Sequence, residues 1–244
     1  MKIVKPVSHY AKGKVEESNR RLRRYGLYGI GFICLAVPAG LLTEFLDPGT
    51  GFIAGFVFFT PGLVLMLIAL SSWQECAPTR KGIQGEEVVT WELSHLSDEF
   101  VLLNDVMLPG GSGNIDHIVI GPTGVFVIET KNYSGKYVCY GDRWFFQGRR
   151  QKYDVSSVSV QARNNARVLA NLLHSSGFTA DVNPIIVFAH PSVQLWLHSP
   201  TVPVLKNGHI CSFLLAQKPG FRLTATYSDK LADRILASNR MPKA

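Results

Sequence analysis

The sequence lacks the signatures of several large classes of enzyme and metal site. Its four cysteines lie far apart in 244 residues and form no Cys-x-x-Cys pair, so no zinc ribbon is present and a disulfide framework is not expected. The seven histidines show no spacing typical of zinc ligands. No Walker loop, Rossmann glycine fingerprint or Gly-x-Ser-x-Gly elbow occurs. The chain therefore offers no motif of the enzymes that depend on those elements.

A strong excess of one charge is also missing from most of the chain. The net charge is +7, but residues 1–26 hold eight Lys or Arg against two Glu, whereas the chain from residue 74 onward has 17 basic and 14 acidic residues. Charge alone does not mark the globular part as a nucleic-acid binder. The basic segment 1–26 is better explained by membrane orientation and anionic lipid, with nucleic-acid contact as the alternative.

Two long runs contain no charged residue at all. Residues 27–43 and 51–72 have 17 and 22 residues, enough to cross about 30 Å of hydrocarbon. Pro38 and Pro61 would break soluble helices but are tolerated in membrane helices. These runs predict a transmembrane helical hairpin over residues 27–73, which makes the lipid bilayer a partner.

The distribution of basic residues predicts the orientation of this hairpin. Lys and Arg precede the first run, and Arg80 and Lys81 follow the second, whereas the connector at 44–50 is acidic and has neither. Basic residues flank the cytoplasmic ends of membrane helices. We therefore expect a multi-pass protein of the inner (plasma) membrane with both termini in the cytoplasm.

After an expected linker at residues 74–84, the pattern becomes α/β over residues 85–244. Apolar runs of strand length alternate with stretches at the helical period. The predicted helices cover about 85–97, 157–175 and 228–239, and the predicted strands cover 101–108, 115–120, 125–129, 136–140, 183–190, 201–205 and 209–215.

One predicted hairpin carries opposed charges. A turn at residues 121–124 (GPTG) places Ile118 opposite Val127 and Asp116 opposite Glu129, with the two carboxylates about 5 Å apart by Cβ. Like charges so placed are destabilising, and a divalent cation between them fits. Lys131 lies on the same face of its strand as Glu129. Asp116, Glu129 and Lys131 therefore form a candidate metal site with a cation beside it.

Two predicted helices add polar residues to this cluster. Glu86 lies about 20° from Leu93 on the inward stripe of the first helix, whereas Glu87 points away from it. Gln161 sits at the edge of the apolar stripe of the second helix. Both Glu86 and Gln161 could reach the site.

Several motifs occur in a characteristic order: Gly85-Glu86 at a helix start, Ile115–Ile118 (IDHI), residues 121–131 (GPTGVFVIETK), Gly135 and a helical Gln161. Together they resemble the nuclease-related domain, often called NERD, over about residues 80–190. That family belongs with the PD-(D/E)XK restriction-endonuclease-like superfamily. The resemblance implies an α/β fold with a restriction-endonuclease-like mixed sheet flanked by helices, here preceded by two transmembrane helices.

The resemblance also implies roles for the candidate residues. Asp116 and Glu129 match the acids that hold Mg²⁺, for which Mn²⁺ can substitute, and Lys131 matches the lysine that positions or activates the attacking water. Glu86 matches the helix carboxylate, and Gln161 matches the later helical glutamine. The family usually has Asn-Pro before that glutamine, where this chain has Ser157-Val158.

We therefore predict a membrane-anchored, Mg²⁺-dependent nuclease that hydrolyses phosphodiester bonds in nucleic acid, with DNA as the expected substrate. Two alternatives are a non-catalytic nucleic-acid-binding module with a degenerate nuclease fold and a membrane scaffold that binds a protein partner. The presence of Asp116, Glu129 and Lys131 together favours the enzyme. The aromatic and basic stretch at 144–152 could follow a nucleic-acid backbone or form a strand with a solvated basic turn.

Overall fold

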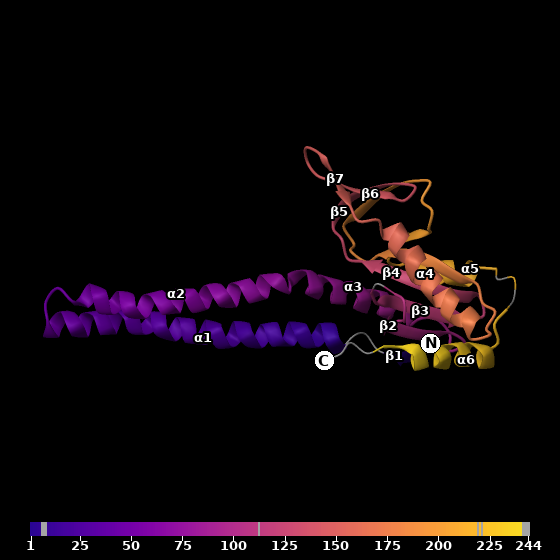
Figure 1. Ribbon diagram of the computed structural model, residues 1–244. Coiled ribbons are helices and arrows are strands. Elements are labelled where there is room, and N and C mark those ends of the chain that lie inside the picture. Colours follow the sequence, from indigo (N-terminus) through magenta and orange to yellow (C-terminus); the bar gives the residue numbers. More distant parts are fainter. Residues whose placement is uncertain (6–8, 112, 219, 221, 241–244) are drawn as a thin grey trace. The chain divides into compact units, whose positions relative to one another are not determined.

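The computed structural model describes residues 1–5, 9–111, 113–218, 220 and 222–240 (Figure 1). The chain separates into two compact units. The first, called here the helical hairpin, is His9–Lys81, and the second, the α/β domain, combines Met1–Ser8 with Gly82–Ala244. The chain thus leaves the α/β domain after its first residues and returns to it after the hairpin.

The helical hairpin consists of α1 (His9–Leu46) and α2 (Gly51–Glu75). A Cβ on Gly29 would lie 2.9 Å from the carbonyl oxygen of Gly62, so glycine is needed for the helices to approach this closely. Both helices are long and apolar enough to cross a membrane by length and composition. Apolar side chains remain exposed on both, among them Leu27 and Phe52, which are 70% and 83% exposed.

The residues expected to form a linker are helical. α2 ends at Glu75 and α3 begins at Ala77 and ends at Leu93, so the helix expected at 85–97 starts eight residues earlier and ends four residues earlier. Pro78 stands in the first turn of α3, where its missing N–H removes no intrahelical bond. α3 includes residues that favour a helix, among them Arg80, Lys81 and Gln84, and it continues past Gly85. Gly85 therefore lies in the interior of the helix.

The larger sheet of the α/β domain has six strands in the order β1-β2-β3-β4-β8-β10. β2, β3 and β4 are antiparallel neighbours. β1 pairs in parallel with β2, β8 in parallel with β4, and β10 in parallel with β8. The strands are β1 (Lys2–Lys5), β2 (Val101–Val106), β3 (Ile115–Gly121), β4 (Gly124–Lys131), β8 (Val182–Phe188) and β10 (Val204–Lys206).

Residues 1–26, expected as one basic segment, are divided between the two units. Lys2–Lys5 pair with β2 as an edge strand of the domain, and α1 begins at His9. The pairing joins segments about a hundred residues apart in the chain, and local charge gives no sign of it. The prediction of a single segment was therefore wrong for these first residues.

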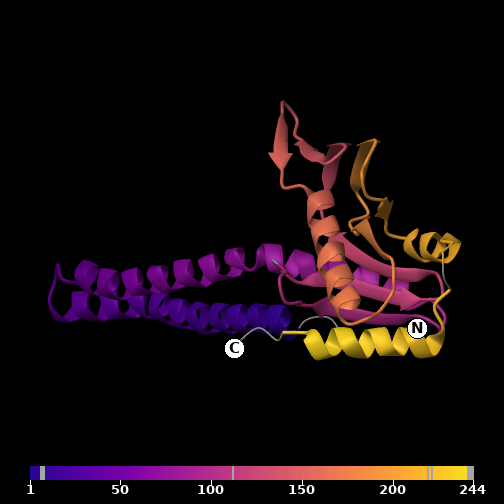
Figure 2. The ribbon, with the colours of Figure 1, turned by 45° about the vertical axis from the view of Figure 1, so that its right-hand side comes forward.

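Helices cover both faces of the six-stranded sheet (Figure 2). Ile118 and Ile120 pack in one core with α4 (Val158–Ser175) and α6 (Ala225–Ser238), and Val119 packs in another with α3 and α5 (Ile210–Ala216). This arrangement explains why β3 and β4 are apolar on both faces. The short strand expected at 209–215 was wrong, because these residues form α5.

The predicted register of the central hairpin is confirmed. His117 pairs with Ile128, Ile118 with Val127 and Ile120 with Val125. Continuing this register by one residue brings Asp116 opposite Glu129.

A second sheet has four strands in the order β7-β6-β5-β9. Its strands are β5 (Gly135–Tyr140), β6 (Arg143–Gln147), β7 (Lys152–Val155) and β9 (Val193–His198). One face packs on the domain through buried Cys139, Trp144 and Val193, which meet Ile186 and Phe188 of β8. The aromatic and basic stretch at 144–152 is therefore a β-hairpin that joins β6 and β7.

Candidate active site

The site begins where β3 and β4 reach the far end of their hairpin. Asp116 is partly buried, and its Oδ2 accepts a hydrogen bond of 2.7 Å from the backbone N–H of Thr130. Glu129 is only 1% exposed. The sheet register thus fixes two carboxylates side by side on the face that α4 covers.

Glu129 is held by both of its carboxylate oxygens. Lys131 Nζ donates to Oε1 at 2.7 Å, and Asn165 Nδ2 donates to Oε2 at 3.2 Å. Lys131 Nζ also donates to Gln161 Oε1 at 3.1 Å. The ammonium group is therefore fixed between strand β4 and helix α4, and its side chain is only 16% exposed.

The geometry of α4 explains how Gln161 and Asn165 reach the same place. The helix begins at Val158, and the hydroxyl of Ser157, its N-cap, accepts a hydrogen bond from the backbone N–H of Val160. Residues four apart lie above one another on a helix, so Gln161 and Asn165 project in the same direction. Sequence reasoning missed Asn165, although its spacing of four from Gln161 was the available signal.

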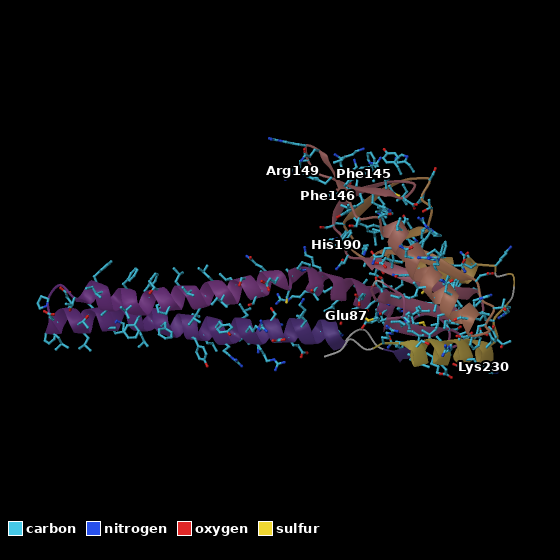
Figure 3. The ribbon with its side chains drawn as sticks, in the orientation of Figure 1. Glu87, Phe145, Phe146, Arg149, His190 and Lys230 are labelled. Carbon is cyan, nitrogen blue, oxygen red and sulfur yellow. The ribbon has the colours of Figure 1, made fainter. Side chains whose placement is uncertain are left out.

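Glu86 approaches from α3 because the preceding residue is glycine. A Cβ on Gly85 would lie 2.7 Å from the Cβ of Asn132, so only glycine lets α3 come this close to the end of β4. Glu86 is partly buried and its charge acts on Asp116, whereas Glu87 is exposed (Figure 3). This agrees with the inward and outward directions expected from helical geometry.

The carboxylates of the cluster are destabilised as anions. Burial raises the pKa of Asp116 well above its usual value, and the charges of Glu129 and Glu86 raise it further, against the Thr130 hydrogen bond and Lys131, which lower it. Burial also raises the pKa of Glu129, although Lys131 and Asn165 oppose this effect. Burial lowers the pKa of Lys131, but Glu129, Tyr133 and Asp116 outweigh it and the pKa is raised. Lys131 is therefore a cation, and acid groups gather around it.

The donor set fits a small divalent cation that keeps water ligands. Mg²⁺ in proteins is bound through one or two carboxylates, with water and substrate phosphate completing its shell. Asp116 retains Oδ1 for this purpose, beside the carboxylate of Glu129. In the described part of the chain, no three His, Cys, Asp or Glu side chains form a metal-binding group. An ion held by Asp116 and Glu129 would therefore need oxygens of water or substrate to complete its shell.

His117, next to Asp116 in sequence, is not part of the cluster. It lies on the opposite face of β3, fully buried, with Nδ1 at 2.7 Å from Asn104 Oδ1. Burial lowers the pKa of His117 to about 3, so the ring is neutral near pH 7. It is a core histidine, as its place on the strand predicts.

One family profile matches the part of the chain that holds this site. The profile of the family described as "Nuclease-related domain" (NERD) matches residues 81–189, which include all five predicted site residues and Asn165. An uncharacterized protein of Bacillus anthracis is 45% identical over 78 residues, 30% of this chain and 37% of that protein. The match thus spans little more than a third of the relative's length. No solved structure matches the chain. Residues 81–189 are therefore similar to the nuclease-related domain.

Proposed function

We propose that this protein is a membrane-anchored nuclease that hydrolyses phosphodiester bonds in DNA with the help of Mg²⁺ or Mn²⁺. The observation that carries the proposal is the position of Lys131. Its ammonium is held by Glu129 and Gln161 beside a carboxylate, Asp116, that is costly to keep ionised. With a divalent cation bound to the acid groups, a buried ammonium beside them would suit the binding and cleavage of a phosphate diester.

Each residue then has a chemical task. Asp116 and Glu129 would hold the ion, which when bound polarises the phosphate and lowers the pKa of water. Lys131 orients the attacking water and stabilises the negative charge that grows on the phosphate oxygens as the new O–P bond forms and the old one breaks. Gln161 and Asn165 keep Lys131 and Glu129 in position. Glu86 provides a further carboxylate at the edge of the site that can take up a proton from the water.

The membrane anchor is supported by the helical hairpin and by the path of the chain. Both helices satisfy the length and hydropathy of a membrane span. Residues before and after the hairpin belong to the same compact unit, so an even number of spans separates them. The basic residues at the two ends favour the cytoplasm for that unit. Reporter fusions in the connector at 44–50 and after Ala244 test this, and an external signal from the second would contradict it.

A cleavage assay tests the enzymatic proposal. The full chain, purified in detergent, is incubated with plasmid and linear DNA with and without Mg²⁺ or Mn²⁺. The full chain is needed because a fragment starting at residue 74 would lack β1 and leave the edge of β2 unpaired. We expect cleavage only with the metal.

Substitutions in the same assay separate the roles. Lys131→Ala should abolish cleavage while largely preserving Mg²⁺ binding, because an ammonium is not a metal ligand. Glu87→Gln, on the exposed side of α3, is the matched control and should cleave like the parent. If the parent binds DNA but never cleaves it with either metal, the domain is a binding module. If it neither cleaves nor binds DNA, a membrane scaffold is the better explanation.

A further inference from the structure

The four-stranded sheet has one face that the proposed active site does not use. Side chains alternate along its strands, and Tyr137, Cys139 and Trp144 point inward to the domain core. The residues between them point the other way, and cross-strand pairing aligns them in rows. We call this surface the outer face, and its main residues are Lys136, Tyr140, Arg143, Phe145, Lys152, Trp196 and His198.

Aromatic rings on the outer face are unusually exposed. Trp196 is 54% exposed and Tyr140 47%, whereas Val138, which lies in the same strand as Tyr140 and pairs with Trp196, is 2% exposed. The Tyr140 ring stacks on His198 with centroids 4.6 Å apart and planes 8° from parallel. A contiguous patch of solvent-exposed aromatic side chains, unlike single exposed ones, is typical of a binding surface.

Cations accompany each ring. Lys136 Nζ lies 3.2 Å from the centre of the Trp196 ring, Arg143 lies 5.2 Å from that of Phe145, and Lys152 lies 5.6 Å from that of Tyr140. The same face also carries the carboxylate of Asp154, which lies 3.8 Å from Arg143. The outer face therefore combines π surfaces with a net positive charge.

The β6–β7 turn extends this positive surface. Arg149 and Arg150 are both exposed there, and Figure 3 shows Arg149 projecting beyond Phe145 and Phe146 at one end of the α/β domain. Lys230 on α6 lies at the opposite end of the domain in the same view. The basic residues near the rings thus belong to one region of the domain.

We propose that the outer face binds single-stranded nucleic acid. Bases of a single strand expose their π faces and stack on aromatic side chains, while Lys and Arg contact the phosphates. A duplex keeps its bases stacked inside and offers no such faces to a sheet. The cations that cover the rings would exchange that contact for phosphate oxygens, so the charge complementarity favours a polyanion over an apolar protein partner.

The outer face is close along the chain to the candidate active site. β4 ends at Lys131 and Lys136 lies five residues later, a stretch that spans at most about 18 Å. Between them, Tyr133 is 38% exposed, and its ring is 6.0 Å from Lys131 Nζ. As a description of the substrate, the inference rests on the proposed nuclease function. As a binding surface, it stands on its own.

Fluorescence anisotropy tests the inference without metal. The full chain in detergent is titrated into a fluorescein-labelled thymidine 20-mer, a uridine 20-mer and a DNA duplex of the same length. We expect Trp196→Ala and Tyr140→Ala each to weaken binding of the single strands about fivefold or more. Trp91→Ala is the matched control, because Trp91 is an exposed tryptophan on α3, outside the outer face. Its ring packs against His95 as the Tyr140 ring packs against His198. This variant should bind like the parent.

A charge series adds a second readout. Lys136→Ala should make the dependence of binding on salt less steep, because one phosphate contact is lost, whereas Lys230→Ala should not. Trp196→Phe should restore most of the affinity and shows whether Trp196→Ala acts through stacking rather than unfolding. The inference is overturned if the outer-face variants bind like the Trp91→Ala protein, or if the duplex binds as tightly as the single strands. Intact binding without cleavage by the parent with Mg²⁺ would instead remove only the nuclease proposal.

Discussion

Two buried glutamates of the α/β domain, Glu92 and Glu129, differ in the groups that donate hydrogen bonds to their carboxylates. Glu92, in α3, is 7% exposed and accepts backbone hydrogen bonds from Gly208 at 2.7 Å and Ile210 at 2.8 Å, at the start of α5. Glu129, in β4, is 1% exposed, is bound by the Lys131 and Asn165 side chains, and lies beside Asp116. Burial is similar in the two places, but the partners differ.

The difference separates a carboxylate with a structural role from one for which we propose a catalytic role. Glu92 meets fixed backbone donors near the positive end of a helix, which hold its charge in one place. Glu129 is bound by two side chains instead and lies beside a second acid, and we propose that this pair of carboxylates binds the metal ion. The following predictions test this contrast, from the largest expected effect to the smallest.

Cleavage should separate the two glutamates most strongly. Glu129→Gln removes charge from the proposed metal site and should lower the initial rate of DNA cleavage with Mg²⁺ by at least about a hundredfold. Glu92→Gln should leave that rate close to the parent's. Rates on plasmid DNA, measured at a temperature where both variants are folded, decide the matter. Equal losses in the two variants would remove the contrast.

For the free energy of unfolding, in contrast to the cleavage rate, we expect substitution of Glu92 to have the large effect. Glu92→Ala leaves the N–H groups of Gly208 and Ile210 without their partner, which should lower the free energy of unfolding by roughly 2–3 kcal/mol. Glu87→Ala, an exposed neighbour on α3, controls for the loss of a negative charge on the helix. Urea unfolding of the full chain gives both values. An unchanged midpoint for Glu92→Ala would show that the cap does not stabilise α5.

The smallest effect concerns the repulsion at the proposed site. Asp116→Asn should leave the metal-free stability unchanged or raise it by up to about 1 kcal/mol, because one of two opposed charges is gone. Mg²⁺ should raise the melting temperature of the parent but not of this variant. Thermal melts with and without Mg²⁺ provide the comparison. A melting temperature several degrees lower for Asp116→Asn without metal would make the carboxylate structural.

The hairpin at the centre of the site could be predicted from sequence because its information is local. The GPTG turn sets the register of β3 and β4, and the alternation of strand side chains then places Asp116 and Glu129 on one face. Helical periodicity likewise separates Glu86 from Glu87. Asn165 stands one helical turn after Gln161, and only that spacing of four places it at the site, because an amide on a helix carries no charge or apolar signal of its own.

The remaining differences come from contacts between distant segments. α5 resembled a short strand because it is apolar and only seven residues long, and its start depends on Glu92, more than a hundred residues earlier. β1 depends on β2 in the same way. The outer face required the pairing of β5 with β9, since Trp196 stands next to Val138 only after the sheet forms. No local pattern reveals such partners.

The distance in sequence between β1 and β2 also determines the order in which the two strands are synthesised and can pair. β1 ends at Lys5 and β2 begins at Val101, so the ribosome delivers the first strand and then the whole helical hairpin before the partner strand exists. At about 5–20 residues per second, that interval lasts roughly 5–20 seconds. During this time the hairpin can enter a bilayer while the first strand waits unpaired. The edge of the sheet is therefore closed only after the whole hairpin has been made, so the last pairing of the domain follows the synthesis of the proposed membrane anchor.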